Sequence, residues 1–196
     1  MERADVKELY YIAPIINMSS IIQHGILSNE LSKKLPHKSV AMQEIQYKRK
    51  NKKIPGARRL HQYANLYFDA HNPMLCKRQD QNNQICILCV NALVLDLPDV
   101  IISDRNAASD WAKFSTVSDG LAALDKNKIY ARYWTNVNNQ HDAWEFKSIK
   151  CAEVLIPDRV ESKFISGACV ANQTALKAFK KLNIPLTVGI KNDMFF

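Results

Sequence analysis

The chain has 196 residues, of which 47% are hydrophobic, and it carries a formal net charge of +8. This apolar content is enough for one core, and no linker rich in Pro, Gly or Ser divides the sequence, so we expect a single domain over residues 1–196. No apolar run approaches the ~18 residues that a membrane span needs, and residues 1–8 carry too many charges of both signs for a signal peptide. The composition argues against membrane-spanning and secreted proteins and favours a cytoplasmic one.

The first elements expected along the chain are a strand and a short helix. A β-rich run at 9–16 contains a proline that ends it. Asn17 or Ser19 can cap the helix that follows, and Gly25 suits the left-handed position at which such a helix stops.

A second helix is expected in the basic part of the chain. Ser39 is its predicted N-cap, and the cationic residues 48–50 lie in its last turns, where the helix dipole favours positive charge. The Ile-Pro-Gly sequence at 54–56 breaks the pattern. Arg49 would then lie near the end of a basic helix, from which its guanidinium can reach a ligand.

The rest of the chain mixes strands with few helices. A turn at 103–109 is expected to lead into a helix through Trp111 and Phe114, and 121–124 to form another helical turn. Further strands are expected at 60–69, 85–90, 100–102, 153–156, 164–170 and 184–190, and a helix at 172–182. Because strands outnumber well-formed helices and cluster late, the expected fold class is α+β.

Positive charge is concentrated in one segment. Residues 33–59 contain ten Lys or Arg against one acid, Glu44, so this segment alone carries +9, and the rest of the chain has 17 basic and 18 acidic residues. Such a local field indicates binding of a polyanion or of a phosphate-bearing ligand. The alternative is a solvated basic helix face, although such faces usually mix charges of both signs.

The cysteines indicate neither disulfides nor a metal. Their number, five, is odd for a disulfide framework. Cys86 and Cys89 form a C-x-x-C pair inside the apolar run 85–90, which is typical of a buried strand with its cysteines on opposite faces. No second Cys or His pair occurs at ligand spacing, so we expect no metal.

One carboxylate, Glu153, interrupts the apolar run 151–157. A run of this length closed by a proline is typical of a buried strand, where a charge must be paired, hydrogen-bonded or used in chemistry. The alternative is a strand-end Glu that points to water. The polar segment 127–150 raises a similar choice, because its aromatics Tyr133, Trp134 and Trp144 either pack as a satellite cluster or form a platform on which a base stacks.

Four stretches, in this order and at this spacing, resemble the DarT family of bacterial DNA ADP-ribosyltransferase toxins. They are Leu9-Tyr10-Tyr11-Ile12-Ala13 with Asn17-Met18; Ile45-Gln46-Tyr47-Lys48-Arg49 with Ile54-Pro55; His61-Gln62-Tyr63 through Tyr67-Phe68 to Asn72-Pro73-Met74-Leu75; and Cys151-Ala152-Glu153-Val154-Leu155-Ile156. A weaker match lies at Ser103-Asp104-Arg105-Asn106-Ala107. The resemblance extends over nearly the whole chain.

This resemblance implies an ADP-ribosyltransferase fold, in which two small antiparallel or mixed sheets form an NAD-binding cleft with helices at the periphery. It implies that the co-substrate is NAD+, without a metal, that the acceptor is a base in single-stranded DNA, thymine or guanine, and that a macrodomain-type antitoxin is the partner. Glu153 and Arg49 match the family's catalytic residues. The implied cofactor contacts are Tyr11, Ile12, Ala13, Asn17, Ser20, Ser28 and Arg49. The DNA contacts expected with them are Lys48, Tyr67, Tyr133, Trp134 and Trp144.

The chain departs from the family pattern in its first strand. Tyr11 stands where members often have His, and Ala13 where they often have Thr. A tyrosine can still hydrogen-bond a ribose hydroxyl, whereas Ala13 offers only its backbone. Two other functions are compatible with the residues, namely an ADP-ribosyltransferase of the same fold that acts on RNA or protein, and a non-catalytic nucleic-acid-binding domain, in which Glu153 would be dispensable.

Overall fold

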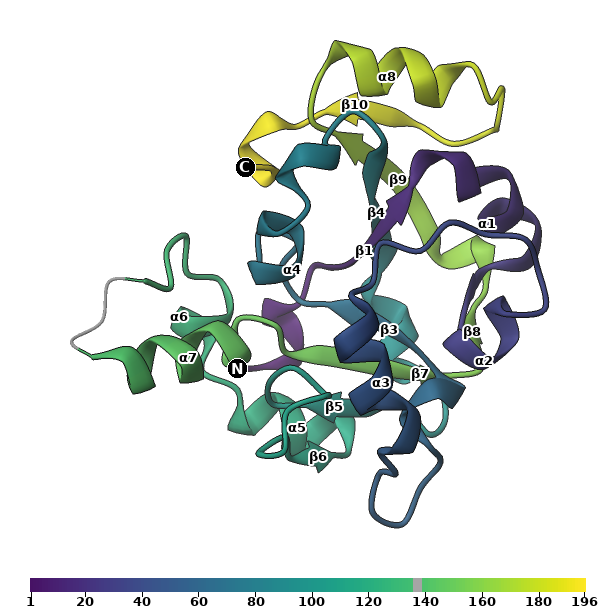
Figure 1. The fold of residues 1–196 in the computed structure, drawn as a ribbon. Coiled ribbons are helices and arrows are strands. Elements are labelled where there is room, and N and C mark those ends of the chain that lie inside the picture. The colour runs from purple at the N-terminus through teal and green to yellow at the C-terminus, as the bar shows by residue number, and fades with distance from the viewer. Residues whose placement is uncertain (136–138) are drawn as a thin grey trace.

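The computed structural model describes residues 1–135 and 139–196 (Figure 1). The helices are α1 (Met18–His24), α2 (Asn29–Ser32), α3 (Gln43–Asn51), α4 (Pro73–Cys76), α5 (Val117–Ala123), α6 (Lys126–Ile129), α7 (Gln140–Ile149) and α8 (Gln173–Lys180). The strands are β1 (Glu8–Pro14), β2 (Ile26–Leu27), β3 (Tyr63–Tyr67), β4 (Ile85–Asn91), β5 (Ile101–Ser103), β6 (Phe114–Ser115), β7 (Glu153–Pro157), β8 (Arg159–Val160), β9 (Ile165–Val170) and β10 (Val188–Ile190). The predicted α+β class is confirmed.

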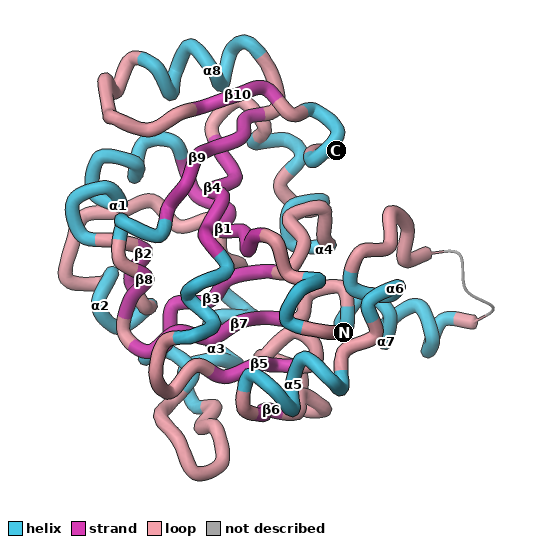
Figure 2. The backbone as a smooth tube through the Cα atoms, turned by 180° about the vertical axis from the view of Figure 1, so that it is seen from behind, coloured by secondary structure: helices cyan, strands magenta, loops and turns pink. Residues whose placement is uncertain are grey.

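The main sheet is mixed and has the strand order β10-β9-β4-β1-β3-β7-β5-β6, and β2 and β8 form a second, two-stranded sheet. Within the main sheet, β1 pairs with β4 over seven residues, but β1 and β3 meet at only one pair, Tyr10 with Tyr67. The sheet therefore consists of two halves joined at a single point, and Figure 2 shows β9, β4 and β1 running at a steep angle to β3, β7 and β5. The expected pair of small sheets corresponds to these two halves.

Residue alternation explains how β3 and β7 are held. Ala64 and Leu66 point into the largest apolar cluster together with Val154 and Ile156 of β7. On the opposite face, Tyr63 and Leu155 pack in a smaller cluster with Ile54, Leu60 and Ala107. Both faces of these strands are thus covered, as expected for a strand with the near-continuous apolar sequence of β7.

The first helix ends as expected. Gly25 has φ +83, in the left-handed region, and a Cβ there would lie 2.3 Å from the carbonyl oxygen of Val160 in β8. The glycine therefore permits both the turn after α1 and the close approach of β8. Asn17 is the N-cap residue of α1, although its side chain makes no capping hydrogen bond.

Two helix predictions are wrong in detail. The basic helix α3 begins at Gln43 rather than after Ser39, because the Ser39 hydroxyl accepts a hydrogen bond from Ala41 N and forms a local turn instead. The helix expected through Trp111 and Phe114 does not form. Residues 104–113 make turns, and Phe114 begins β6, because pairing of β6 with β5 satisfies its backbone.

The cysteine prediction for β4 agrees with the structure, since Cys86 belongs to the largest apolar cluster and Cys89 packs against a different one. The polar segment 127–150 contains the last three residues of α6 and all of α7, and residues 136–138 fall outside the described part. None of the helices in the described ranges has the length and apolar character needed to cross a bilayer.

Candidate active site

A cavity with a volume of about 420 Å³ lies where the two halves of the main sheet diverge. Its walls come from β1, β3, α1, α3, the segment joining α2 to α3, and α7. Nine of the residues singled out in the sequence line it: Tyr11, Ile12, Asn17, Ser20, Lys48, Arg49, Tyr67, Trp144 and Glu153. In the described ranges, no group of three or more His, Cys, Asp or Glu side chains is placed to hold a metal ion.

The centre of the site is a buried ion pair between Arg49 and Glu153, residues that are 104 positions apart in the sequence. Arg49 Nη1 lies 3.0 Å from both Glu153 Oε1 and Oε2. Ala107 N donates a further hydrogen bond of 3.0 Å to Oε1. Glu153 is 1% exposed and Arg49 6%. A carboxylate this deeply buried needs partners of this kind. Glu153 is therefore a buried, paired residue and not a strand-end Glu that points to water.

The apolar cluster on the outer face of β7 places both partners of Glu153. Ile54, which follows α3, and Ala107, which follows β5, pack against Leu155 two residues after Glu153. Burial of these side chains brings the end of α3, with Arg49, and the Ala107 N–H to the first residue of β7. The cluster therefore positions the polar groups.

The two carboxylate oxygens of Glu153 are not equivalent. Oε1 accepts two hydrogen bonds, from Arg49 and Ala107, whereas Oε2 accepts one, from Arg49. An ionised carboxylate has about two acceptor positions on each oxygen, so Oε2 retains capacity for a ligand hydroxyl. Among the described residues, Arg49 Nε and Nη2 make no hydrogen bond, and these nitrogens are available to a second anionic or polar group.

Tyr67 joins the two halves of the sheet at the site. It pairs with Tyr10 of β1 on one side and with Glu153 of β7 on the other. Burial, together with the neighbouring Glu153 charge, raises the pKa of Tyr67 well above its usual value, and burial raises the pKa of Tyr11 in the opposite wall. Both phenols are therefore neutral at physiological pH, and each can donate a hydrogen bond.

The model of the DarT family, described as ssDNA thymidine ADP-ribosyltransferase, matches residues 10–196. The chain belongs to the DarT family.

Relatives and solved structures agree with this assignment. The chain is 32% identical over 202 residues to a DNA ADP-ribosyl transferase-DNA ADP-ribosyl glycohydrolase fusion protein of Thermosipho africanus, a match covering 97% of this chain and 49% of the fusion. The structure of Thermosipho africanus DarTG in complex with ADP-ribose has a TM-score of 0.81 at 28% identity and covers 97% of this chain and 51% of that one. Thermus sp. 2.9 DarT in complex with ADP-ribosylated ssDNA has a TM-score of 0.82 at 25% identity, covering 98% and 97%. This DarT chain thus spans about half the length of the Thermosipho fusion.

Four of the residues expected at the site do not line the cavity of this chain. Ala13 is fully buried in the core, and its carbonyl oxygen accepts a hydrogen bond from the Cys86 thiol. Ser28 is buried as the N-cap of α2, where its hydroxyl accepts from Leu31 N. Tyr133 is exposed outside the cavity.

Trp134 is the fourth. It is buried, and its ring makes edge contacts with His71, at a centroid distance of 6.0 Å, and with Phe196, at 5.7 Å. Trp134 is therefore a packing residue, the alternative to a base-stacking platform. Trp144, which is 65% exposed on α7, lines the cavity.

Asn17 lines the cavity, but its side chain is already engaged. Its amide Nδ2 donates to Lys38 O at 2.7 Å, and its Oδ1 accepts from Lys38 N at 3.0 Å. These two bonds attach the segment between α2 and α3 to the start of α1, so that Val40 and Met42 form part of the cavity wall. Asn17 thus shapes the cavity by holding this segment.

Sequence reasoning missed several residues of the site. Ala107, which donates to Glu153, offered no side-chain signal, and only the weak family match at 103–107 pointed to it. His61 was noted only as part of a family motif, yet it lines the cavity and its buried Nε2 has no hydrogen-bond partner in the described part of the chain. Burial is the main cause that lowers the pKa of His61, and the charges of Lys33 and Arg49 add to it.

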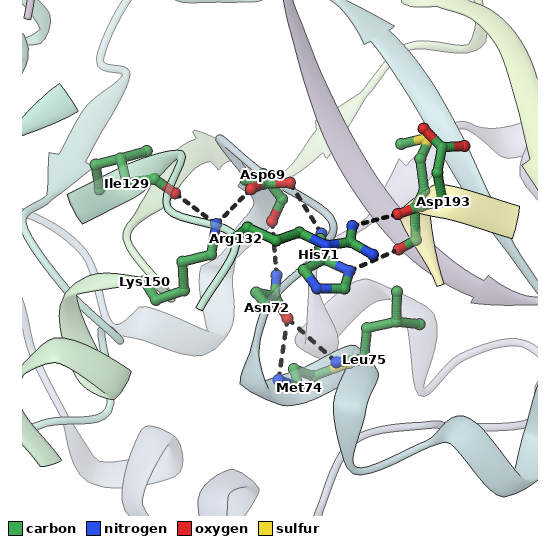
Figure 3. Close-up of polar contacts among 10 residues, drawn as sticks. Asp69, His71, Asn72, Met74, Leu75, Ile129, Arg132, Lys150 and Asp193 are labelled. Carbon is green, nitrogen blue, oxygen red and sulfur yellow. Dashed lines mark hydrogen bonds and ion pairs between the residues drawn. The ribbon is translucent and has the colours of Figure 1, made fainter. Parts of the chain in front are cut away.

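A second buried ion pair lies just before β7 and ties this strand to the end of β3 (Figure 3). Lys150 is 2% exposed. Its ammonium group pairs with Asp69 Oδ2 and donates a hydrogen bond of 2.7 Å to Ile129 O. Asp69 Oδ1 accepts from His71 N at 2.9 Å. Burial lowers the pKa of Lys150, and the charge of Asp69 opposes the shift. The pair therefore holds the segments that follow Tyr67 and precede Glu153.

Breaking this pair is expected to destabilise the protein, and more so when the partner left behind is the more deeply buried one. Asp69→Asn leaves a buried ammonium without its counter-charge and should cost about 3–5 kcal/mol of unfolding free energy. Lys150→Met should cost less, because Asp69 is partly exposed and keeps the His71 N–H. The double variant should lose less than the sum of the two. Urea unfolding of the four proteins measures this, and additive losses would show that the two residues do not interact.

The stability of the protein is expected to fall as the pH is lowered from about 7.5 to 5.5. Burial lowers the pKa values of His61 and His71, with Arg49 and Arg132 as further cationic neighbours of the respective rings. A histidine with a lowered pKa in the folded state binds its proton more readily when unfolded, so stability is lost as the pH falls below the unfolded value of about 6.5. Each group contributes at most about 1.4 kcal/mol per pH unit.

Thermal unfolding at a series of pH values checks this expectation. His71→Gln should flatten the dependence, whereas His141→Gln, in which the replaced side chain is 86% exposed, should leave it unchanged. An unchanged slope in the His71 variant would contradict the assignment.

Proposed function

We propose that this DarT chain is an NAD+-dependent mono-ADP-ribosyltransferase that modifies a base in single-stranded DNA. The observation that supports it best is the buried Arg49–Glu153 pair at the wall of the cavity, in a chain of this family. Residues 1–196 would act as one transferase domain. The bound ADP-ribose of Thermosipho DarTG and the ADP-ribosylated ssDNA bound to Thermus DarT are consistent with this substrate and product class.

The reaction exchanges one bond at the ribose C1′ of NAD+ for another. The bond to the nicotinamide nitrogen breaks and its electron pair leaves with nicotinamide, so positive charge builds up on the ribose, as in glycoside hydrolysis. Glu153 Oε2 accepts a hydrogen bond from a ribose hydroxyl and its charge stabilises this state. A nitrogen of the acceptor base then bonds to C1′, and the proton displaced from that nitrogen passes to Glu153.

Arg49 has two functions in this scheme. One nitrogen, Nη1, pairs with both carboxylate oxygens of Glu153 and orients them. Its Nε and Nη2 can then hold an NAD+ phosphate or stabilise the negative charge on a base that is losing its proton. The planar, permanently charged guanidinium can do both at once, which a lysine ammonium cannot.

The remaining wall residues suit NAD+ and a flipped-out base. Tyr11, Ile12 and Ser20 line the part of the cavity formed by β1 and α1. Trp144 on α7 is exposed and can stack on the acceptor base. Lys48 and Tyr67, which also line the cavity, would contact this base or its backbone. A base must leave its stack to be attacked, which favours single-stranded substrates. The family description names thymidine, so thymine is the first base to test and guanine the second.

We also propose that the protein acts as the toxin of a toxin–antitoxin pair. A transferase that modifies cellular DNA requires an activity that reverses the modification. The Thermosipho relative carries a DNA ADP-ribosyl glycohydrolase in the same chain. The partner proposed for this chain is therefore a glycohydrolase antitoxin of the macrodomain type, and the compartment proposed for both is the cytoplasm.

Mass spectrometry of short oligonucleotides after incubation with NAD+ tests the proposed function. Single strands that contain only one reactive base type should gain the mass of one ADP-ribose, and fragmentation should place it on the base. Duplex DNA, RNA and a mixture of proteins serve as parallel acceptors. Modification of RNA or protein instead of DNA would replace the acceptor, and DNA binding without any transfer would indicate a non-catalytic nucleic-acid-binding domain.

A further inference from the structure

Trp111 is a large aromatic side chain that the fold leaves in solvent. It lies in the segment 104–113 between β5 and β6 and is 80% exposed. In the described ranges, no other aromatic ring packs against its indole and no cation lies over it. Exposing an indole of this size sacrifices the favourable burial that a tryptophan usually achieves, so a functional contact is the simplest reason to retain it there.

The segment that carries Trp111 is held in place by hydrogen bonds. At its base, Asp104 N donates to Lys113 O at 3.1 Å, and Lys113 N donates to Asp104 Oδ1 at 2.8 Å. Asn106 N donates to Ser148 O of α7 at 2.9 Å. Trp111 is therefore presented by a braced turn, which reduces the entropy that binding would otherwise lose.

The same segment forms part of the active-site wall. Ala107 N holds the Glu153 carboxylate, and Ser109 lines the cavity. The main-chain oxygen of Ser109 accepts a hydrogen bond from the Lys52 ammonium, which lies one residue after α3. The Ser109 hydroxyl in turn accepts from Trp111 N at 3.3 Å. The main chain of Trp111 is thus hydrogen-bonded to a residue of the cavity wall two positions earlier, and its side chain is exposed to solvent.

We propose that Trp111 stacks on a nucleobase next to the acceptor base and so helps to select single-stranded DNA. This inference rests on the proposed function. A nucleobase is the occupant that the surroundings favour, because the site of transfer is in the adjoining cavity and the segment 33–59, with its charge of +9, supplies cations for a polyanion on the neighbouring wall. Each base of a single strand has a flat aromatic face, and the indole needs no particular sequence to stack on it.

The first test compares Trp111→Ala and Trp111→Phe in steady-state transfer to an oligonucleotide. Trp111→Ala should raise the KM for DNA about tenfold while kcat changes little, since alanine substitution at a base-stacking position weakens binding by roughly 5- to 150-fold. Trp111→Phe should retain most of the affinity because a ring remains. NAD+ affinity, measured by calorimetry without DNA, should be unchanged in both. Leu93→Ala, another exposed apolar side chain, is the matched control and should behave as wild type.

The second test removes the base rather than the indole. Oligonucleotides with one abasic position on either side of the acceptor base are tested on wild type and on Trp111→Ala. One abasic position should reproduce the tenfold loss in wild type and add nothing in the variant.

An unchanged KM for Trp111→Ala would overturn the inference. A loss of NAD+ affinity or of kcat in both Trp111 variants would also overturn it, because it indicates a structural role of the segment. So would additive losses of Trp111→Ala and every abasic position, because the indole would then contact something other than a base, such as a protein partner. These results differ from failure of the proposed function, in which wild type itself does not modify DNA.

Discussion

Glu153→Gln is expected to reduce transfer of ADP-ribose to DNA by a factor of at least about 100, the lower range for loss of a positioned acid–base group. The amide has the shape of the carboxylate and can still accept from Ala107 N, but it carries no charge to stabilise the ribose and it cannot take the proton of the acceptor base. The expected loss of rate comes mainly from the missing charge at Oε2, the oxygen that accepts only one hydrogen bond in the structure. The rate is measured by mass spectrometry of the modified oligonucleotide under saturating NAD+.

Binding measurements separate chemistry from folding in this variant. Affinities for NAD+ and for single-stranded DNA should stay within a few fold of wild type, since neither depends mainly on the Glu153 charge. Thermal unfolding shows how far the uncompensated, 6% exposed Arg49 destabilises the fold. Wild-type transfer by a folded Glu153→Gln protein would remove Glu153 from the mechanism.

Arg49→Lys is expected to leave the protein folded but to lower transfer by one or more orders of magnitude. A lysine ammonium can approach Glu153 and preserve the buried ion pair, but it has no second nitrogen for an NAD+ phosphate or for the acceptor base. Arg49→Ala should be as inactive and also less stable, because Glu153 is then buried with only the Ala107 N–H as a partner. Removing one partner of a buried pair costs about 3–5 kcal/mol.

The difference between these two variants is the informative quantity. If Arg49 only held Glu153 in place, Arg49→Lys would restore transfer along with stability. If Arg49 also contacts substrate, stability returns and transfer does not. Urea unfolding and single-turnover rates on the same preparations give both values. Lys50→Ala, next to Arg49 on α3, exposed and outside the cavity wall, controls for the loss of one positive charge from this helix. Full activity of Arg49→Lys would contradict a direct role in the reaction.

The pKa values of the two tyrosines in the cavity wall limit which groups can act as a base. Tyr11 and Tyr67 stay neutral because burial raises their pKa values, so these phenols cannot act as bases near neutral pH. Of these three groups, only Glu153 is proposed to accept the proton of the acceptor base. Tyr67→Phe, which removes only the phenol oxygen, would separate a hydrogen bond to the substrate from the packing role of the ring.

The sequence by itself determined the α+β class, the apolar strand that contains Glu153, the basic helix that contains Arg49, and the family. Those features depend on local patterns: an interrupted apolar run, a cluster of cations, and short motifs whose order and spacing are read directly from the chain. The turn at Gly25 was also predictable from the sequence, because the left-handed conformation depends on the type of that one residue.

Only the tertiary structure decided which of these residues meet. Arg49, Ala107 and Glu153 converge because Ile54 and Ala107 pack on Leu155, a contact among residues far apart in the sequence. The same long-range packing makes Trp134 a buried neighbour of His71, and β6 pairing with β5 replaces the expected helix and leaves Trp111 in solvent. Side-chain burial and strand pairing arise from the whole fold, and local propensity is too weak to specify them.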